Sequence, residues 1–339
     1  MSTEGTGPLL MIRDLHVEFP LFRRTVHAVN GCSITVEPGQ IVGVVGESGS
    51  GKSVTALASL GLIAPPGRVR GSIMLNGEEI VGRAESALAH MRGATAAMIF
   101  QNPTTALNPY FTVGRQMIDV IRLHRSRESA AAKRAALEAL KQVGLPDVES
   151  QLQKYPHQLS GGQLQRVMIA MALALEPRLL IADEPTTALD VTVQAQIIVL
   201  LRDLAAREGL SVLFITHDLG VVASLCDRVS VMYAGAVVEE GAVNDIFASP
   251  AHPYTRKLLD TVPKLGTGKR EFTAIPGQVP DLSRPPAGCP FHPRCEKATD
   301  LCSKDIPASH RVGGGHTAVC HYPERPLKLV ASQGRSDTV

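Results

Sequence analysis

The stretch that most constrains this chain of 339 residues is GESGSGKS at positions 46–53. It follows the apolar run 40–45 and precedes the helix-forming run 54–60, so it is expected to join a buried strand to a helix. The glycines let backbone N–H groups turn inward toward a phosphate, and the helix N-terminus adds partial positive charge. Lys52 would reach the outer phosphates of a triphosphate, and the Ser53 hydroxyl would bind magnesium. A glycine-rich turn that binds nothing is disfavoured by the lysine and by the flanking elements.

Composition narrows the class of protein further. The length exceeds that of a usual single domain, so one large domain with an appendage is expected, and 44% hydrophobic residues are ample for a core. A net charge of +2, no Trp and 4% aromatic residues argue against a dedicated nucleic-acid binder. The N-terminus lacks the features of a signal peptide, and the longest apolar runs, 167–175 and 197–201, are too short to span a membrane. The chain is therefore expected in the cytosol, with any membrane association made through a partner.

The first hundred residues read as short strands. Runs 9–19 and 33–37 are predicted to form an antiparallel edge, followed by the strand that leads into the phosphate loop. Run 72–75 ends at Asn-Gly, a strong hairpin signal, and run 97–100 leads directly into Gln101. The N-terminal part therefore predicts an antiparallel sheet beside a parallel one.

The pattern then changes to helices. Residues 129–143 are rich in Ala, Glu and Lys and end at a glycine, which predicts a helix within an insertion between strands. Such an insertion either covers a sheet edge or provides motion and partner contact beside a nucleotide site. The motif LSGGQ at 159–163 then opens a helical run over 164–175, which predicts a second anion site at a helix N-terminus.

Two later strands end in polar side chains. The strand at 179–182 is followed by Asp183 and Glu184, and the strand at 211–216 by His217. In a doubly wound sheet the carboxyl ends of the strands form the ligand-binding edge. Asp183 is expected to hold magnesium, Glu184 to orient or deprotonate the attacking water, and His217 to contact a terminal phosphate. The alternatives are a helix-capping acidic pair and a structural histidine.

The phosphate loop, Gln101, LSGGQ, the Asp-Glu pair and His217 occur once each, in this order. This set resembles the ATP-binding subunit of an ABC transporter over about residues 9–250, and LSGGQ is its most specific part. The resemblance implies an α/β fold, a P-loop ABC-type ATPase with an antiparallel β edge, a helical subdomain at about 102–175 and a small Cys-containing C-terminal extension.

The resemblance also implies roles for particular residues. Phe19 takes the position that stacks on adenine, although a lone Phe at a strand end is as readily a core residue. Asp190 lies in the loop that crosses a dimer interface. The expected ATP-binding residues are Phe19, Gly46, Ser48, Gly49, Ser50, Gly51, Lys52, Ser53, Val54, Ser160, Gly161, Gly162, Gln163 and Asp190. The expected magnesium ligands are Ser53, Gln101 and Asp183, and the expected catalytic residues are Glu184, His217 and Gln101.

In proteins of that family the LSGGQ helix of one subunit caps the nucleotide held by the phosphate loop of another. The resemblance therefore implies that one copy alone hydrolyses ATP poorly and that the chain works beside a second ABC ATPase subunit, more often as a heterodimer than as a homodimer. The segment 101–114 would transmit closure of the pair to a membrane permease.

The C-terminal part has a different composition. From residue 263 onward it holds ten of the 23 prolines and four of the six cysteines, Cys289, Cys295, Cys302 and Cys320. Disulfides are disfavoured in a reducing cytosol. Spacing alone leaves zinc, an iron–sulfur cluster and free thiols open, with three histidines as substitute ligands. These histidines are His310, His316 and His321, and the other two cysteines, Cys32 and Cys226, are expected to be buried apolar residues.

Two segments in this part, IPGQVP at 275–280 and GCPFHPRC at 288–295, resemble the C-terminal extension of dipeptide and oligopeptide importer ATPases. This resemblance implies an ATPase that energises peptide import with Mg²⁺, two permease subunits and an extracytoplasmic binding protein, as a peripheral protein at the cytoplasmic face of the inner membrane. It favours a 4Fe-4S cluster over zinc on the four cysteines. The expected divisions are an ABC domain at 1–262, the extension at 263–330 and a disordered tail at 331–339.

Three alternatives stay open at this point. Relatives that carry nickel, glutathione, opines or sugars have similar ATPases, so the solute is not fixed by this chain. A soluble ABC ATPase of translation or DNA repair would show two nucleotide modules or a long coiled-coil insertion, and neither is visible. The cysteine region is alternatively a metal or redox sensor that regulates the pump.

Overall fold

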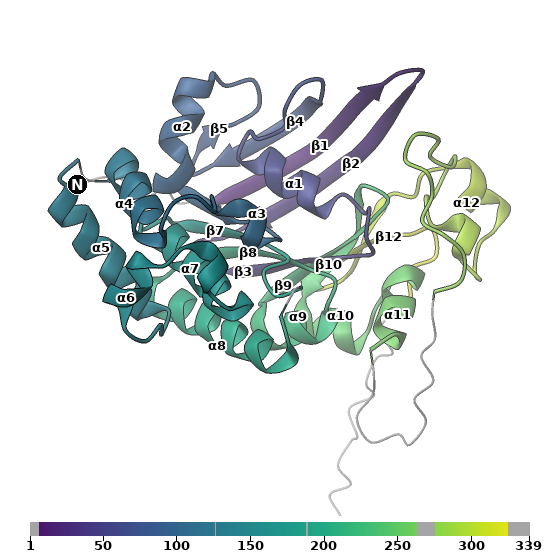
Figure 1. The fold of residues 1–339 in the computed structure, drawn as a ribbon. Helices are drawn as coiled ribbons and strands as arrows, with labels where there is room; N and C mark the ends of the chain where they lie inside the picture. Colours follow the sequence, from purple (N-terminus) through teal and green to yellow (C-terminus); the bar gives the residue numbers. More distant parts are fainter. Residues whose placement is uncertain (1–6, 126, 188, 263–274, 325–339) are drawn as a thin grey trace, which may run out of the picture.

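The computed structural model describes residues 7–125, 127–187, 189–262 and 275–324. Its strands form one sheet in the order β11-β12-β10-β9-β3-β8-β7-β6 and a second in the order β2-β1-β4-β5. Figure 1 shows the helices α4, α5 and α6 at one end of the molecule and α12 at the other, with the strands between them. The predicted 331–339 tail lies outside the described residues.

The centre of the larger sheet is parallel, because β3 pairs in parallel with both β8 and β9, and β7 pairs in parallel with β6 and β8. Every residue of β3, β7 and β8 is buried, as expected for parallel strands that are covered on both faces. The carboxyl ends of these strands meet at one edge. The bounds are β3 Ile41–Val45, β6 Ala96–Ile99, β7 Leu179–Asp183, β8 Ser211–Thr216, β9 Arg228–Tyr233 and β10 Ala236–Ala242.

The smaller sheet is antiparallel and confirms the predicted edge. Its strands are β1 Leu10–Leu21, β2 Arg24–Val36, β4 Arg68–Leu75 and β5 Glu78–Glu79. β2 begins nine residues before the predicted run at 33–37. Its register with β1 shifts three times, and these irregularities break the strict alternation by which a strand is recognised.

The predicted helical insertion is present between β6 and β7. It consists of α3 Pro103–Ala106, α4 Val113–His124, α5 Ser129–Gln142, α6 Val148–Gln153 and α7 Gly161–Leu173. The helix predicted at 129–143 therefore ends within one residue of its predicted end. The other helices are α1 Lys52–Ser59, α2 Glu85–Ala94, α8 Val191–Glu208, α9 Leu219–Leu225, α10 Val243–Ala248, α11 Pro253–Asp260 and α12 Asp300–Lys304.

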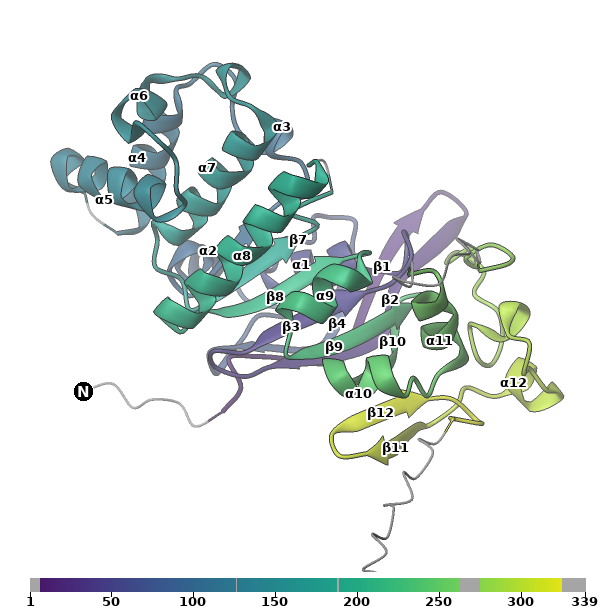
Figure 2. The same cartoon turned by 90° about the horizontal axis from the view of Figure 1, so that it is seen from below.

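The C-terminal part adds a hairpin to the main sheet, which the sequence did not predict. β11 Ser309–Gly313 pairs with β12 His316–Val319, and β12 pairs with β10 through Glu239 and Glu240. Figure 2 shows this hairpin at the end of the sheet away from helices α4–α7. The strands are only four or five residues long, and residues 313–315 at the turn between them are all glycine, so no clear strand pattern marks them.

A buried carboxylate fastens this hairpin to the body. Glu239 accepts hydrogen bonds from the backbone N–H groups of Ala251 (2.6 Å) and His252 (2.8 Å), and its Oε1 lies 2.7 Å from Nε2 of His316. Both Glu239 and His316 are buried. His316 was considered as a substitute metal ligand, and this was wrong, because strand pairing places its ring against Glu239.

His252 gives the protein a pH dependence of stability. Its ring is buried, which lowers its pKa from 6.5 to about 4, and Nδ1 accepts a hydrogen bond from the Tyr254 backbone at 3.0 Å. Because the unfolded chain binds this proton near pH 6.5, the stabilising contribution is complete above that pH and is lost as the pH falls toward 4. We expect this histidine alone to lower the free energy of unfolding by roughly 3 kcal/mol over that range.

Chemical denaturation at pH 7 and pH 4.5 measures this effect, and His252→Asn, which keeps an acceptor at the helix start, is the matched control. The variant should lose less stability on acidification than the natural protein. An equal loss in both proteins would contradict the assignment to His252.

Candidate active site

The phosphate loop connects β3 to α1, as the sequence predicted. Close packing against neighbouring backbone atoms, as well as backbone conformation, requires glycine at two of its positions. Gly51 has φ +98, and a Cβ atom there would lie 2.5 Å from the carbonyl oxygen of Ala28. A Cβ atom on Gly46 would lie 2.2 Å from the carbonyl oxygen of Met232. Since real Cβ contacts are never this short, no other residue fits at either position without displacing the backbone.

Lys52 lies folded over the loop that precedes it. Its Nζ donates to the carbonyl oxygens of Gly46 at 2.8 Å and Glu47 at 3.0 Å. Burial lowers the pKa of Lys52, and the nearby carboxylates of Glu184 and Asp183 act in the opposite direction. An ammonium held here is placed to exchange carbonyl oxygens for phosphate oxygens.

Ser53 and Asp183 meet at the carboxyl edge of the sheet. The Ser53 hydroxyl donates to Oδ1 of Asp183 at 3.0 Å, although the two residues are 130 positions apart. Burial raises the pKa of the buried Asp183 carboxyl, and the hydrogen bond from Ser53 partly offsets this. A hydroxyl and a carboxylate oxygen side by side are the hard ligands that Mg²⁺ prefers, so these residues fit the predicted magnesium site.

Glu184 is the point where three other side chains converge. Its Oε2 accepts hydrogen bonds from Nε2 of Gln101 and from the hydroxyl of Thr187, both at 2.9 Å, and lies 3.5 Å from Nδ1 of His217. The Glu184 backbone adopts φ +46, a conformation that is rare outside glycine and recurs at functional sites. The structure thus brings Gln101, Glu184 and His217 together, as predicted.

Thr187 was not predicted, although a hydroxyl residue three positions after the acidic pair was a usable signal. The alternative that the acidic pair caps a helix is wrong. The next helix, α8, is capped by Asp190, whose Oδ1 accepts from the Val193 backbone at 2.9 Å.

The LSGGQ residues lie at the start of α7, where Ser160 and Gln163 form a reciprocal cap. The Gln163 backbone donates to the Ser160 hydroxyl at 3.3 Å, and the Ser160 backbone donates to Oε1 of Gln163 at 3.0 Å. Gly162 faces Val193 so closely that a Cβ would lie 2.7 Å from its Cγ1. Within the described residues no hydrogen bond joins these positions to the phosphate loop.

The other predicted ATP-binding residues have mixed surroundings. Ser50 is buried, while Ser48 and Gly49 are exposed. Phe19 is partly buried and packs with Val54 against the core beneath the antiparallel sheet. Its predicted stacking on adenine stays a prediction.

The four C-terminal cysteines line one small pocket of about 20 Å³, together with His292 and His321. Burial raises the pKa of the Cys289 and Cys295 thiols and raises that of Cys320 to about 11, so these thiols stay protonated at neutral pH. Nowhere in the described ranges are three or more His, Cys, Asp or Glu side chains arranged so that they could hold one metal ion. The four cysteines therefore lie close together, but their arrangement does not support the predicted iron–sulfur or zinc site.

The remaining cysteines behave as predicted. Cys32 is fully buried and Cys226 partly buried, and burial raises the pKa of each thiol to about 12. Both are therefore small apolar residues of the core rather than reactive groups.

Comparison with known proteins shows which families and solved structures this chain resembles. The family model described as "ABC transporter" matches residues 29–187, and the one described as "Oligopeptide/dipeptide transporter, C-terminal region" matches residues 238–302. The solved dimeric structure of the ATP-binding cassette MJ0796, in a post-hydrolysis state bound to ADP and Pi, has a TM-score of 0.62 and 27% identity, covering 69% of this chain and 98% of that one.

Curated relatives extend the similarity over nearly the whole chain. The oligopeptide transport ATP-binding protein OppD of Salmonella typhimurium is 47% identical over 329 residues, 96% of this chain and 98% of the relative. The dipeptide transport ATP-binding protein DppD of Escherichia coli is 48% identical over 316 residues, 93% of this chain and 97% of the relative. The chain therefore belongs to the ABC transporter family, within its group of oligopeptide and dipeptide transport ATP-binding proteins.

Proposed function

We propose that this protein hydrolyses ATP to energise the import of dipeptides and oligopeptides through a membrane permease. The observation that carries the proposal is the convergence of Gln101, Thr187 and His217 on Glu184, beside the Ser53–Asp183 pair at the phosphate loop. The names of the relatives supply the peptide substrate. The same ATPase role for nickel, glutathione, an opine or a sugar, or a soluble non-transport role, is the alternative.

Reconstitution in vesicles with the two permease subunits and the extracytoplasmic binding protein tests this function. Peptide-loaded binding protein should raise the ATPase rate, and peptide should accumulate inside. Stimulation by another solute but not by peptide would favour the alternative.

Each group at the site has a defined role in the proposed reaction. Lys52 and the loop N–H groups neutralise the phosphate oxygens as negative charge builds on them. Glu184 accepts a proton from the attacking water, and Gln101 and Thr187 hold the carboxylate in orientation. His217 donates to the γ-phosphate. Mg²⁺, held by Ser53, Gln101 and Asp183, would neutralise the β- and γ-phosphate oxygens when bound.

The active site is proposed to be completed by a second ATPase subunit, in a heterodimer. The exposed Ser160 cap belongs to α7 and has no hydrogen bond to the loop of its own chain within the described ranges. An exposed helix N-terminus is suited to a phosphate of another chain, and residues 160–163 with Asp190 would form that face.

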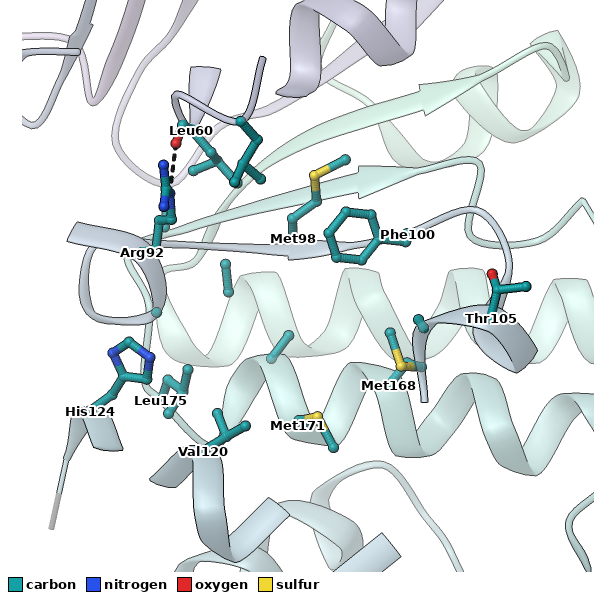
Figure 3. Close-up of a pocket in the computed structure, with 16 residues that line it drawn as sticks. Leu60, Arg92, Met98, Phe100, Thr105, Val120, His124, Met168, Met171 and Leu175 are labelled. Carbon is teal, nitrogen blue, oxygen red and sulfur yellow. Dashed lines mark hydrogen bonds between the residues drawn. The ribbon is translucent and has the colours of Figure 1, made fainter. Parts of the chain in front are cut away.

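A groove beside Gln101 is the proposed contact with the permease. The groove is a cavity of about 560 Å³. Figure 3 shows its mostly apolar lining, which includes Met98, Phe100, Val120, Met168 and Met171. It lies between β6 on one side and helices α4 and α7 on the other. Because Phe100 adjoins Gln101, a permease helix seated here would move with the residue that contacts Glu184.

Met171→Glu tests this contact. The variant should bind the permease subunits at least about tenfold more weakly, because the groove would bury an unpaired charge, while its affinity for ATP stays unchanged. Val199→Glu, at an apolar residue exposed on α8, is the matched control. Affinity chromatography with tagged permease measures the difference, and equal retention of both variants would exclude the groove.

The protein is proposed to work at the cytoplasmic face of the inner membrane as a peripheral subunit. No helix within the described residues is long and apolar enough to cross a membrane. We propose the divisions 1–262 for the ABC domain and 263–330 for the extension, with β12 fastened onto the sheet of the former.

We further propose that Cys289, Cys295, Cys302 and Cys320, which line one pocket, hold a 4Fe-4S cluster, with zinc as the alternative. The resemblance of residues 275–280 and 288–295 to the extension of peptide importer ATPases is what favours the cluster over zinc. Anaerobic purification should give a brown protein with broad visible absorbance and about four irons per chain; a colourless protein with one zinc would contradict it.

A further inference from the structure

Glu47 is a residue of the phosphate loop whose side chain leaves the loop and reaches the C-terminal extension. Its two carboxylate oxygens accept hydrogen bonds from both terminal nitrogens of Arg294, Oε2 from Nη1 at 2.7 Å and Oε1 from Nη2 at 3.0 Å. The two residues are 247 positions apart. This bidentate geometry is the strongest form of an arginine–carboxylate contact and fixes the orientation of both side chains.

Arg294 is itself held on every side. Its side chain is 3% exposed, against 27% for Glu47. Nε donates to the carbonyl oxygen of Pro276 at 2.9 Å, Nη2 also to that of Ile275 at 3.2 Å, and Nη1 also to the Tyr233 hydroxyl at 3.3 Å. With the two bonds to Glu47, all five N–H groups of the guanidinium have a partner. The arginine side chain is therefore held in one conformation, unlike a flexible charge on the surface.

A cluster of packed aromatic rings also supports Arg294. The guanidinium lies 5.7 Å from the ring centroid of Tyr233, and that ring packs against Tyr254 at 4.7 Å and Phe291 at 5.2 Å. Phe291 belongs to the extension, and the two tyrosines belong to the ABC domain. The aromatic contact therefore joins the two parts directly behind the loop.

The backbone of Glu47 is the centre of the loop's own hydrogen bonds. Its N–H donates to the Tyr254 hydroxyl at 3.0 Å, and its carbonyl oxygen accepts from the Ser50 N–H at 3.2 Å and from Nζ of Lys52 at 3.0 Å. A displacement of Glu47 would therefore displace Lys52 and the turn that places the phosphate-binding N–H groups.

We propose that Arg294 is a positioning residue for ATP, through which the C-terminal extension holds the phosphate loop in its binding conformation. The inference rests on the proposed ATPase function and assigns to the extension a part in nucleotide binding. Because Arg294 immediately precedes Cys295, the same contact links the cysteine pocket to the loop. Changes at the thiols would reach the nucleotide by this route.

Arg294→Gln and Glu47→Gln each test the proposal through binding of mant-ATP with Mg²⁺ to the full chain. Each should raise the Kd about tenfold, the lower end of the cost of losing such an outer partner at a ligand site. In the assembled transporter the KM for ATP should rise equally, with kcat at saturating ATP changed by less than about twofold. Arg294→Lys should restore only part of the affinity for ATP, because an ammonium cannot make the bidentate contact of a guanidinium.

The double variant Glu47→Gln with Arg294→Gln should be no weaker than either single variant if the two residues act as one unit. Arg256→Gln is the matched control. Arg256 also joins the ABC domain to the extension, by an ion pair with Glu324, without reaching the loop. Its affinity for mant-ATP should equal that of the natural protein.

Affinity in Arg294→Gln equal to that of Arg256→Gln would overturn the proposal, as would additive losses in the double variant. Should Arg294→Gln not fold, Glu47→Gln decides the matter, since it leaves the carbonyl partners and the aromatic support of Arg294 in place. Absence of ATP binding in the natural protein would instead contradict the proposed function.

Discussion

Glu184→Gln will lower the ATPase rate of the assembled transporter by about 10²- to 10⁴-fold and leave ATP binding intact, because the amide cannot accept the proton of the attacking water. We expect loss of this carboxylate to affect hydrolysis and not ATP binding. Gln101 and Thr187 contact it, whereas Lys52, which is expected to bind phosphate, donates to the carbonyl oxygens of Gly46 and Glu47. The variant should also hold the ATP-bound pair of subunits closed, since the bound nucleotide is not consumed.

Phosphate release by the complex and binding of mant-ATP by the chain measure the two halves of this expectation. Glu176→Gln is the control, because Glu176 is an exposed carboxylate that pairs with Arg125 outside the site. An ATPase rate of the Glu184 variant equal to that of the control would remove Glu184 from the mechanism.

Ser160→Arg has the second largest expected effect. A single chain should bind ATP as tightly as before, because Ser160 has no hydrogen bond to the loop of its own chain within the described ranges. Turnover should nevertheless fall by about 100-fold or more, because the bulky side chain would keep the α7 N-terminus away from the nucleotide of the partner subunit. Loss of the cap itself costs about 1 kcal/mol and leaves the chain folded.

Thr112→Arg separates blockage from loss of a cap. Thr112 caps α4 in the same helical insertion, and its hydroxyl accepts from the Arg115 backbone at 3.2 Å. Light scattering of the ATPase subunits without the permease should show Mg-ATP-dependent pairing for Thr112→Arg and none for Ser160→Arg. Weaker ATP binding by a single Ser160→Arg chain would contradict a site shared between chains.

The sequence predicted the parallel core well because its signals are local. The strands before Gly46, Asp183 and His217 are continuous apolar runs, so the strands themselves and the edge at which these residues meet could be predicted. The gathering of Gln101 and Glu184 across 83 positions was available only through the resemblance to ABC ATPases.

The extension was the part that the sequence could not place. The hairpin β11–β12 is short and depends on pairing with β10, and the carboxylate that holds it, Glu239, reads in the sequence as an ordinary surface residue. The contact between Glu47 and Arg294 has no local signal either. Two charged residues 247 positions apart reveal a contact only when the fold brings them together.

The variants of His252 and Met171 test the surroundings of the site. The proposed function depends above all on an ATP site that is shared between two subunits. The most direct measurement is the mass of the Glu184→Gln chain by light scattering, with and without Mg-ATP, alone and mixed with the ATPase subunit that naturally accompanies it. We expect a particle with two ATPase subunits that forms only when Mg-ATP is present. A chain that binds Mg-ATP yet stays at its single-chain mass of 36.1 kDa in both samples would contradict it.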